Sequence, residues 1–224
     1  MFEKIKIAGL AAAAAFTMAQ SADALTLRVS DSANPLIDFV QIEDGGAGDL
    51  DGIVNGSILT GALNVGGGSL SISTAFALDG ATTSTLQMTV TNAIAGLTDM
   101  WVDVWHSLFS GAAASPQASN ATFTMNASDL STGGELMGRA RVGGVFTGAK
   151  ESITAEGDTI FQSAAVVLDD PFQMRINTDV VAGTTATYDA TLVAAVPVPA
   201  AGFLLLGALG GLGIAGRRRK KKAA

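Results

Sequence analysis

The residues best suited to ligand binding are two tryptophans and an aspartate that alternate along one short segment. Trp101, Asp103 and Trp105 lie within residues 99–106. In a β-strand, side chains two positions apart point to the same face, so these three would share one face. Two indoles beside a carboxylate can stack a sugar ring while the carboxylate accepts its hydroxyl hydrogens. The pattern predicts a glycan-binding site; the alternative is a strand whose tryptophans pack beneath a loop.

The densest group of acidic residues lies in a glycine-rich segment, residues 43–52. Asp44, Asp49 and Asp51 place three carboxylates there, and carboxylate oxygens are ligands that Ca²⁺ prefers. The segment departs from known calcium loops, because Leu50 stands where a glycine-rich nonapeptide needs an acid and the terminal glutamate of an EF-hand is missing. Asp44, Asp49 and Asp51 form a candidate Ca²⁺ site, the alternative being a solvated acidic turn.

The chain offers few residues for catalysis. His106 is the only histidine, no G-x-S-x-G motif accompanies it, and the chain has no cysteine. These absences argue against a serine triad and exclude thiol nucleophiles and histidine-based zinc sites. We therefore expect no enzyme, and no cofactor apart from the Ca²⁺ just considered. A hydrolase whose two carboxylates converge from distant segments stays open as an alternative.

The elements that position these residues are predicted to be strands. Apolar and polar residues alternate with period two in several rows, which are separated by glycine-rich turns such as Gly66-Gly67-Gly68 and Gly143-Gly144. We predict an all-β fold, an antiparallel β-sandwich that is jelly-roll-like, over residues 25–195. Without disulfides, this domain must be held by its core. The alternating rows are 25–30, 70–78, 86–91, 121–125, 172–177 and 188–192.

The first 24 residues have the composition of a secretory signal peptide. Lys4 and Lys6 precede an apolar run over residues 7–18, and Ala22 and Ala24 form an A-x-A cleavage site. We expect export by the Sec machinery and a mature protein that begins directly after Ala24. The alternative is an uncleaved membrane anchor.

The last 29 residues read as a spacer, an apolar helix and a basic stop. Pro197 and Pro199 keep the backbone extended, because proline lacks an N–H and disfavours helix at the residue before it. Residues 200–216 contain no charge and would span about 25 Å as a helix at about 1.5 Å per residue. Six consecutive cations, residues 217–222, would remain cytoplasmic. We predict a short transmembrane helix; a buried C-terminal helix is the alternative.

This tail resembles the PEP-CTERM family of sorting signals in its VPxPA variety, found on exported proteins of Gram-negative bacteria. The chain has Val198 at the position between the prolines, where the family commonly has Glu or Leu. The resemblance implies recognition by an exosortase, a membrane protease or transpeptidase, and removal of the helix. The predicted sorting motif comprises Val196, Pro197, Val198, Pro199, Ala200, Arg217, Arg218 and Arg219, and all of these except Val198 match the family pattern.

The net charge of the central domain limits the classes of partner that it can bind. The chain has net charge −7, but its C-terminal tail carries six basic residues, and residues 25–195 hold five basic and 18 acidic residues, a balance of −13. Such a domain repels phosphates, so nucleic acid is not an expected partner. We expect a protein that is held at the inner membrane as a precursor and then reaches the cell surface or extracellular matrix in a non-catalytic structural role, with extracellular polysaccharide as a candidate partner. The alternatives are a glycan-binding module and a plain single-pass membrane protein.

Overall fold

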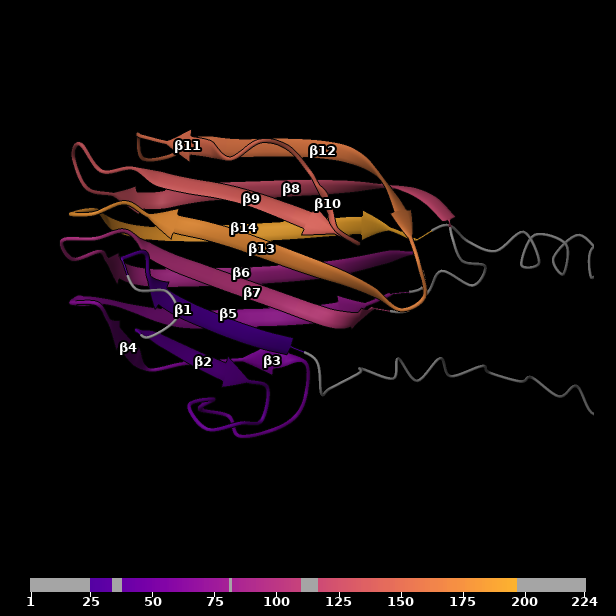
Figure 1. Cartoon of the computed structure of the whole chain (residues 1–224), viewed down its shortest axis with the longest axis horizontal. Helices are drawn as coiled ribbons and strands as arrows, with labels where there is room; N and C mark the ends of the chain where they lie inside the picture. Colours follow the sequence, from indigo (N-terminus) through magenta and orange to yellow (C-terminus); the bar gives the residue numbers. More distant parts are fainter. Residues whose placement is uncertain (1–24, 34–37, 81, 110–116, 197–224) are drawn as a thin grey trace, which may run out of the picture.

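The computed structural model describes residues 25–33, 38–80, 82–109 and 117–196. Every regular element in these residues is a β-strand, and the strands form two antiparallel seven-stranded sheets that face each other (Figure 1). The predicted all-β fold with two antiparallel sheets is therefore confirmed. The jelly-roll-like connectivity stays a prediction.

The first sheet, here sheet A, has the strand order β10-β9-β13-β7-β1-β2, with β11 also paired to β9. Its central strand β7 lies between β1 and β13, so residues far apart in the sequence share one surface. The strands of sheet A are β1 (Leu25–Asp31), β2 (Phe39–Glu43), β7 (Met100–Phe109), β9 (Leu136–Val142), β10 (Val145–Phe146), β11 (Glu151–Ile153) and β13 (Phe172–Val180).

The second sheet, sheet B, has the order β12-β8-β14-β6-β5-β3, with β4 also paired to β5. From β6 onward the long strands pass back and forth between the two sheets, as the chain path in Figure 1 shows. The strands of sheet B are β3 (Ser57–Ile58), β4 (Ala62–Val65), β5 (Gly68–Asp79), β6 (Thr83–Ile94), β8 (Gln117–Leu130), β12 (Thr159–Leu168) and β14 (Thr185–Ala195).

The predicted alternating rows all lie in strands, and most of their apolar positions are buried between the sheets. In β5 an irregularity after Ile72 corrects the predicted row, because beyond it Ala75 and Ala77 are buried and Leu78 is exposed. Buried and exposed residues alternate along β9, β13 and β14, as expected for sheets with one solvated face. The only tyrosine, Tyr188 of sheet B, is fully buried, and its hydroxyl lies 2.7 Å from the hydroxyl of Thr178 in sheet A. Burial raises the pKa of the Tyr188 phenol, so this group is a neutral hydrogen-bonding link between the two sheets.

The two end segments predicted from the sequence, residues 1–24 and the tail from residue 197 onward, lie outside the described residues. Within the described part of the chain, no helix is long and apolar enough to cross a membrane.

Candidate ligand-binding site

The tryptophans and the aspartate of β7 lie on one face of their strand, as predicted, and this face is the outer face of sheet A. Trp101, Asp103 and Trp105 alternate with core-facing residues; both indoles are half-buried and Asp103 is only 6% exposed. In the strand register, Asp103 lies between Arg28 of β1 and Asn177 of β13. The three residues therefore sit in the middle of a sheet, with polar and charged neighbours on both sides.

The carboxylate of Asp103 is already occupied by protein groups. Arg175 donates from Nη2 to Oδ2 at 2.7 Å and from Nε to Oδ1 at 3.2 Å, and Asn177 donates from Nδ2 to Oδ1 at 2.8 Å. This bidentate pairing is the strong geometry for arginine and carboxylate. Asp103 therefore positions Arg175, and its predicted role as an acceptor for sugar hydroxyls stays a prediction.

Arg175 also contacts the neighbouring indole. Its guanidinium carbon lies 5.6 Å from the ring centre of Trp105, a distance at which a cation is attracted to the aromatic face. Asp103 and Trp105 together therefore hold the Arg175 side chain over β7. Because a guanidinium has five N–H donors and Asp103 engages only two of its nitrogens, Arg175 keeps donors for a ligand.

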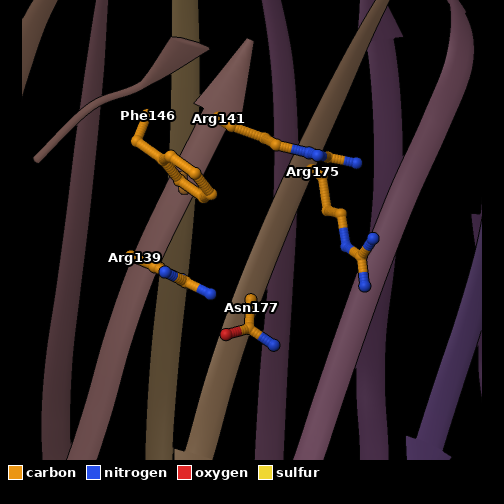
Figure 2. A pocket seen from close by; sticks show the side chains of 6 residues that line it. Arg139, Arg141, Phe146, Arg175 and Asn177 are labelled. Carbon is orange, nitrogen blue, oxygen red and sulfur yellow. The ribbon is translucent and has the colours of Figure 1, made fainter. Parts of the chain in front are cut away.

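A pocket of about 130 Å³ lies beside this group, over β9 and β13. Figure 2 shows Arg141 reaching across β13 toward Arg175, with Phe146 of β10 beside Arg139. The Phe146 ring centre is 4.6 Å from the guanidinium carbon of Arg139. The pocket is lined by Arg139, Ala140, Arg141, Phe146, Arg175 and Asn177, with no acidic residue.

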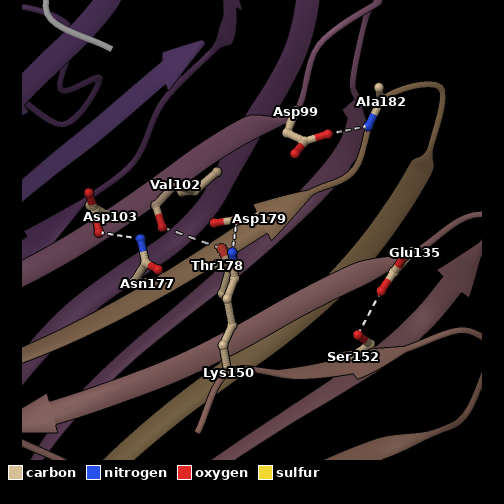
Figure 3. A network of polar contacts seen from close by, with 10 residues as sticks. All are labelled: Asp99, Val102, Asp103, Glu135, Lys150, Ser152, Asn177, Thr178, Asp179 and Ala182. Carbon is tan, nitrogen blue, oxygen red and sulfur yellow. Dashed lines mark hydrogen bonds and ion pairs between the residues drawn. The ribbon is translucent and has the colours of Figure 1, made fainter. Parts of the chain in front are cut away.

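A second hollow of about 220 Å³ adjoins this pocket and shares three of its lining residues. Lys150 forms an ion pair with Asp179 across it, as Figure 3 shows. Burial raises the pKa of the Asp179 carboxyl, and the Lys150 ammonium opposes that rise. The second hollow is lined by Trp101, Asp103, Arg139, Lys150, Arg175, Asn177 and Asp179.

His106 belongs to the core rather than to this face. It is 3% exposed, and its ring centre lies 4.4 Å from that of Phe109. It occupies a core-facing position of β7, between the outward-facing Trp105 and Ser107. The only histidine is therefore part of the packing beneath the site.

The acidic loop between β2 and β3 is organised by its own backbone. Asp44 accepts hydrogen bonds from the backbone N–H groups of Asn55 and Gly56 at 3.2 and 2.6 Å. Asp49 accepts from the N–H groups of Gly45 and Leu59 at 2.9 and 3.1 Å. These carboxylates accept from four backbone N–H groups of the loop, of which the bond to Gly56 is buried and the others are partly buried.

Asp51 is used in the same way. It accepts from the Ile53 N–H at 3.0 Å and from the Asn55 side chain at 2.9 Å. Among the described residues, no three acidic, histidine or cysteine side chains are arranged to hold a metal ion. The predicted Ca²⁺ site at Asp44, Asp49 and Asp51 therefore has no support in this geometry. The alternative, a solvated acidic turn, describes most of this loop, but Asp44 and Asp49 within it are only 7% and 8% exposed.

Several residues of the site were missed by the sequence reasoning. Arg139 and Arg141 alternate with small or apolar residues over 138–142, directly before the Gly143-Gly144 turn, which is a short signal for the strand that carries them. The pairing of that strand with β13, which brings Arg141 opposite Arg175, leaves no comparable trace in the sequence. The missed residues are Arg139, Arg141, Lys150, Arg175 and Asn177.

Of the predicted sorting and cleavage residues, only Val196 lies among the described ones. Its backbone N–H donates to the carbonyl of Thr82 at 2.7 Å, directly after β14 ends. The cleavage-site residues Ala22 and Ala24 lie outside the described residues. The remaining tail residues, also outside them, are Pro197, Val198, Pro199, Ala200, Arg217, Arg218 and Arg219.

Comparison with solved structures finds distant similarities. Latent PorU from Porphyromonas gingivalis matches at 15% identity and TM-score 0.31, over 42% of this chain and 10% of that one. A family 35 carbohydrate-binding module from Clostridium thermocellum matches at 11% identity and TM-score 0.30, over 65% and 93%. A family 11 module from the same organism, in complex with a mixed-linked tetrasaccharide, matches at 14% and 0.28, over 66% and 92%.

These TM-scores are too low for the similarities to carry a functional argument. The chain spans only about a tenth of PorU but most of each of the two modules. No protein-family model matches the sequence, and no curated protein matches it.

Proposed function

We propose that this is an exported, non-catalytic protein whose β-sandwich binds polysaccharide on the outer face of sheet A. The contrast between the two outer faces carries the proposal. Both tryptophans of the chain and all five basic residues of 25–195 gather on the sheet A side. The central strands of sheet B instead present mostly threonine, serine, asparagine and glutamine outward, and no arginine, lysine or tryptophan. A face that only has to be solvated needs no cluster of tryptophan and arginine.

The geometry fits a sugar chain that lies along β7. Trp101 and Trp105 are four strand positions apart, about 13 Å at about 3.3 Å per residue, a span longer than one sugar ring. Half-buried indoles offer an apolar surface at little cost in conformational entropy. Arg175, held by Asp103, is placed to donate hydrogen bonds to ring hydroxyls beside Trp105. Stacking and directional donors are thus combined on one rigid strand pair.

The export route in this proposal is supported by sequence features alone. The signal-peptide pattern ending at Ala24 and the tail beginning at Val196 favour passage through the inner membrane, processing by an exosortase and delivery to the cell surface or matrix. A polysaccharide-binding face suits a protein that acts among extracellular polymers. A single-pass protein that keeps its anchor is the alternative for this part.

Affinity electrophoresis against a panel of soluble neutral and acidic polysaccharides tests the binding proposal. At least one polysaccharide is expected to retard the protein, and Trp101→Ala/Trp105→Ala is expected to abolish the retardation. Phe161→Ala is the matched control, because Phe161 is 66% exposed on β12 of the other sheet. Equal retardation of all three proteins would refute the site on sheet A.

A separate experiment tests the proposal that the protein is not an enzyme. The protein is incubated with each polysaccharide that it binds, and new reducing ends are measured. None are expected, because Asp103 and Asp179, the two carboxylates in the second hollow, are each held in an ion pair. Release of reducing ends that is lost in Asp179→Asn would contradict this part and favour a carboxylate-pair hydrolase.

A further inference from the structure

The positive charge of this acidic domain is concentrated on one side. Residues 25–195 carry a balance of −13, yet their basic residues share the outer side of sheet A. Four of them lie at outward positions of β1, β9 and β13, and the fifth contacts Asp179 of β13. They are Arg28, Arg139, Arg141, Lys150 and Arg175.

Two of these cations are neutralised by aspartates, and two in the pocket are not. Arg175 pairs with Asp103, and Lys150 pairs with Asp179. Arg139 and Arg141 form no ion pair in the part of the chain that the structure describes. Their positive charges therefore face the pocket over β9 and β13 without compensation.

The side-chain nitrogens of Arg139 and Arg141 are also incompletely used. The Nε atoms of both residues are buried without a hydrogen-bond partner among the described residues. Arg141 donates from Nη2 to Oε1 of Gln173 at 3.3 Å, and Arg139 is packed on Phe146. Because a buried donor without an acceptor is costly, a ligand that supplies acceptor oxygens here gains both charge pairing and hydrogen bonds.

We propose that the pocket formed by Arg139, Arg141 and Arg175 binds the anionic substituent of an acidic polysaccharide. This inference rests on the proposed function and names the substrate class. A carboxylate or a sulfate ester matches the planar fork of a guanidinium, which binds such groups through two parallel hydrogen bonds. The absence of any acidic residue from the pocket lining favours the same class.

The position of the pocket relative to the tryptophans indicates how a polysaccharide would lie on sheet A. The pocket shares Arg139, Arg175 and Asn177 with the hollow that contains Trp101. A sugar ring stacked on β7 can therefore project its charged group over β13 toward Arg139 and Arg141. The ring and its substituent would be recognised by neighbouring strands of one sheet.

The net charge of the whole domain favours acidic polysaccharides over other polyanions as ligands. A balance of −13 repels the closely spaced phosphates of nucleic acids and the surface of an anionic membrane. Attraction is confined to one small pocket, which suits a polymer with at most one charge per sugar. Single-stranded DNA serves as the probe for the competing class.

The test compares polymers that differ only in the charged group. Purified full-length protein is titrated with polygalacturonate and its fully methyl-esterified form, and with unmodified dextran and a dextran sulfate of low substitution, at most one sulfate per glucose. In at least one pair the charged polymer is expected to bind at least about tenfold more tightly, and Arg139→Ala/Arg141→Ala is expected to remove that preference. The pair that shows the preference identifies carboxylate or sulfate as the substituent.

Two further variants control for net charge and for folding. Gln87→Glu/Thr124→Glu makes the same change of net charge on the outer face of sheet B and is expected to keep the preference. Arg139→Lys/Arg141→Lys keeps the positive charge but loses the planar guanidinium. This variant is expected to weaken binding of the charged polymer less than the double alanine variant does.

The outcomes separate this inference from the proposed function. Tryptophan-dependent binding with no preference in either pair would overturn the anionic pocket and leave polysaccharide binding intact. No binding of any polysaccharide would overturn both. Arginine-dependent binding of single-stranded DNA at equal strength would overturn the saccharide class.

Discussion

Asp103 and Arg175, 72 positions apart in the sequence, are joined by two hydrogen bonds of 2.7 and 3.2 Å on the outer face of sheet A. Asp103 is nearly buried, whereas the Arg175 side chain is 34% exposed, so the carboxylate anchors a guanidinium that remains open to solvent. The pair fixes a donor beside Trp105, so the proposed binding site depends on the strand register of β7 and β13.

A double-mutant cycle measures this relationship. Asp103→Ala and Arg175→Ala are expected to couple by about 1–3 kcal/mol in urea unfolding, because charge-assisted hydrogen bonds join the two side chains. Gln87→Ala, on the other sheet, serves as the control and should be additive with Asp103→Ala. Positioning also predicts that Asp103→Ala weakens polysaccharide binding at temperatures where it stays folded. Additivity of the first pair would show that the ion pair contributes nothing.

The hydroxyl pair between the sheets predicts an asymmetric response. Thr178→Val removes the partner of the buried Tyr188 hydroxyl and should cost about 1–3 kcal/mol of unfolding free energy. Tyr188→Phe should cost less, about 1 kcal/mol, because Thr178 keeps the Val102 carbonyl as an acceptor at 3.4 Å. The double variant should be less destabilised than the sum of the two. Equal losses that add in full would contradict a shared hydrogen bond.

The acidic loop predicts a structural role that is independent of metal. Asp44→Ala leaves two backbone N–H groups without an acceptor and should lower the unfolding free energy by about 1–3 kcal/mol. Adding Ca²⁺ or a chelator should leave the melting temperature unchanged. If Ca²⁺ bound only the folded state, adding it would raise the melting temperature. A Ca²⁺-dependent rise that disappears in Asp49→Ala/Asp51→Ala would restore the calcium site.

The sequence anticipated the strands better than the site. Period-two alternation identified β1, β5, β6, β8, β13 and β14, because each has one face in the core. Trp101 and Trp105 were placed on one face for the same local reason. The arginine pocket depends on β9 pairing with β13, a long-range register that no local pattern encodes.

The roles of the acidic residues were the hardest to predict. Asp103, Asp44 and Asp49 were seen as ligand-binding carboxylates because their type and spacing permit it. Their hydrogen-bond partners, such as Arg175 and the backbone of Leu59, come from other parts of the chain. Only the folded structure shows that these oxygens are already engaged.

Burial of Asp179 and Asp44 predicts that the fold gains stability on mild acidification. Burial raises the pKa of both carboxyls above their ordinary value of 3.8. The folded state therefore binds protons more tightly than the unfolded chain does, and this contribution is complete below 3.8 and lost as the pH rises through the folded-state pKa. The unfolding free energy should rise from neutral pH toward about pH 4.

Asp179→Asn should reduce that slope in urea unfolding measured at several pH values. Asp51 works in the opposite direction, because hydrogen bonds, first from the Ile53 N–H, lower its pKa; its contribution is lost only as the pH falls below 3.8. An Asp51→Asn variant should therefore keep the wild-type slope above that pH. A slope that is unchanged in Asp179→Asn would show that this carboxyl is not the source.

Processing at both ends predicts a defined mature mass. We expect signal cleavage after Ala24 to give an N-terminus at Leu25, and the two prolines of 196–199 predict an extended site that a membrane protease could bind just outside the bilayer. Mature protein should end near Pro199 and lack residues 202–224. Pro197→Ala/Pro199→Ala should let the helix extend outward and leave uncut precursor in the membrane. Surface-exposed wild-type protein that still carries residues 217–222 by intact mass spectrometry would replace sorting with simple membrane anchoring.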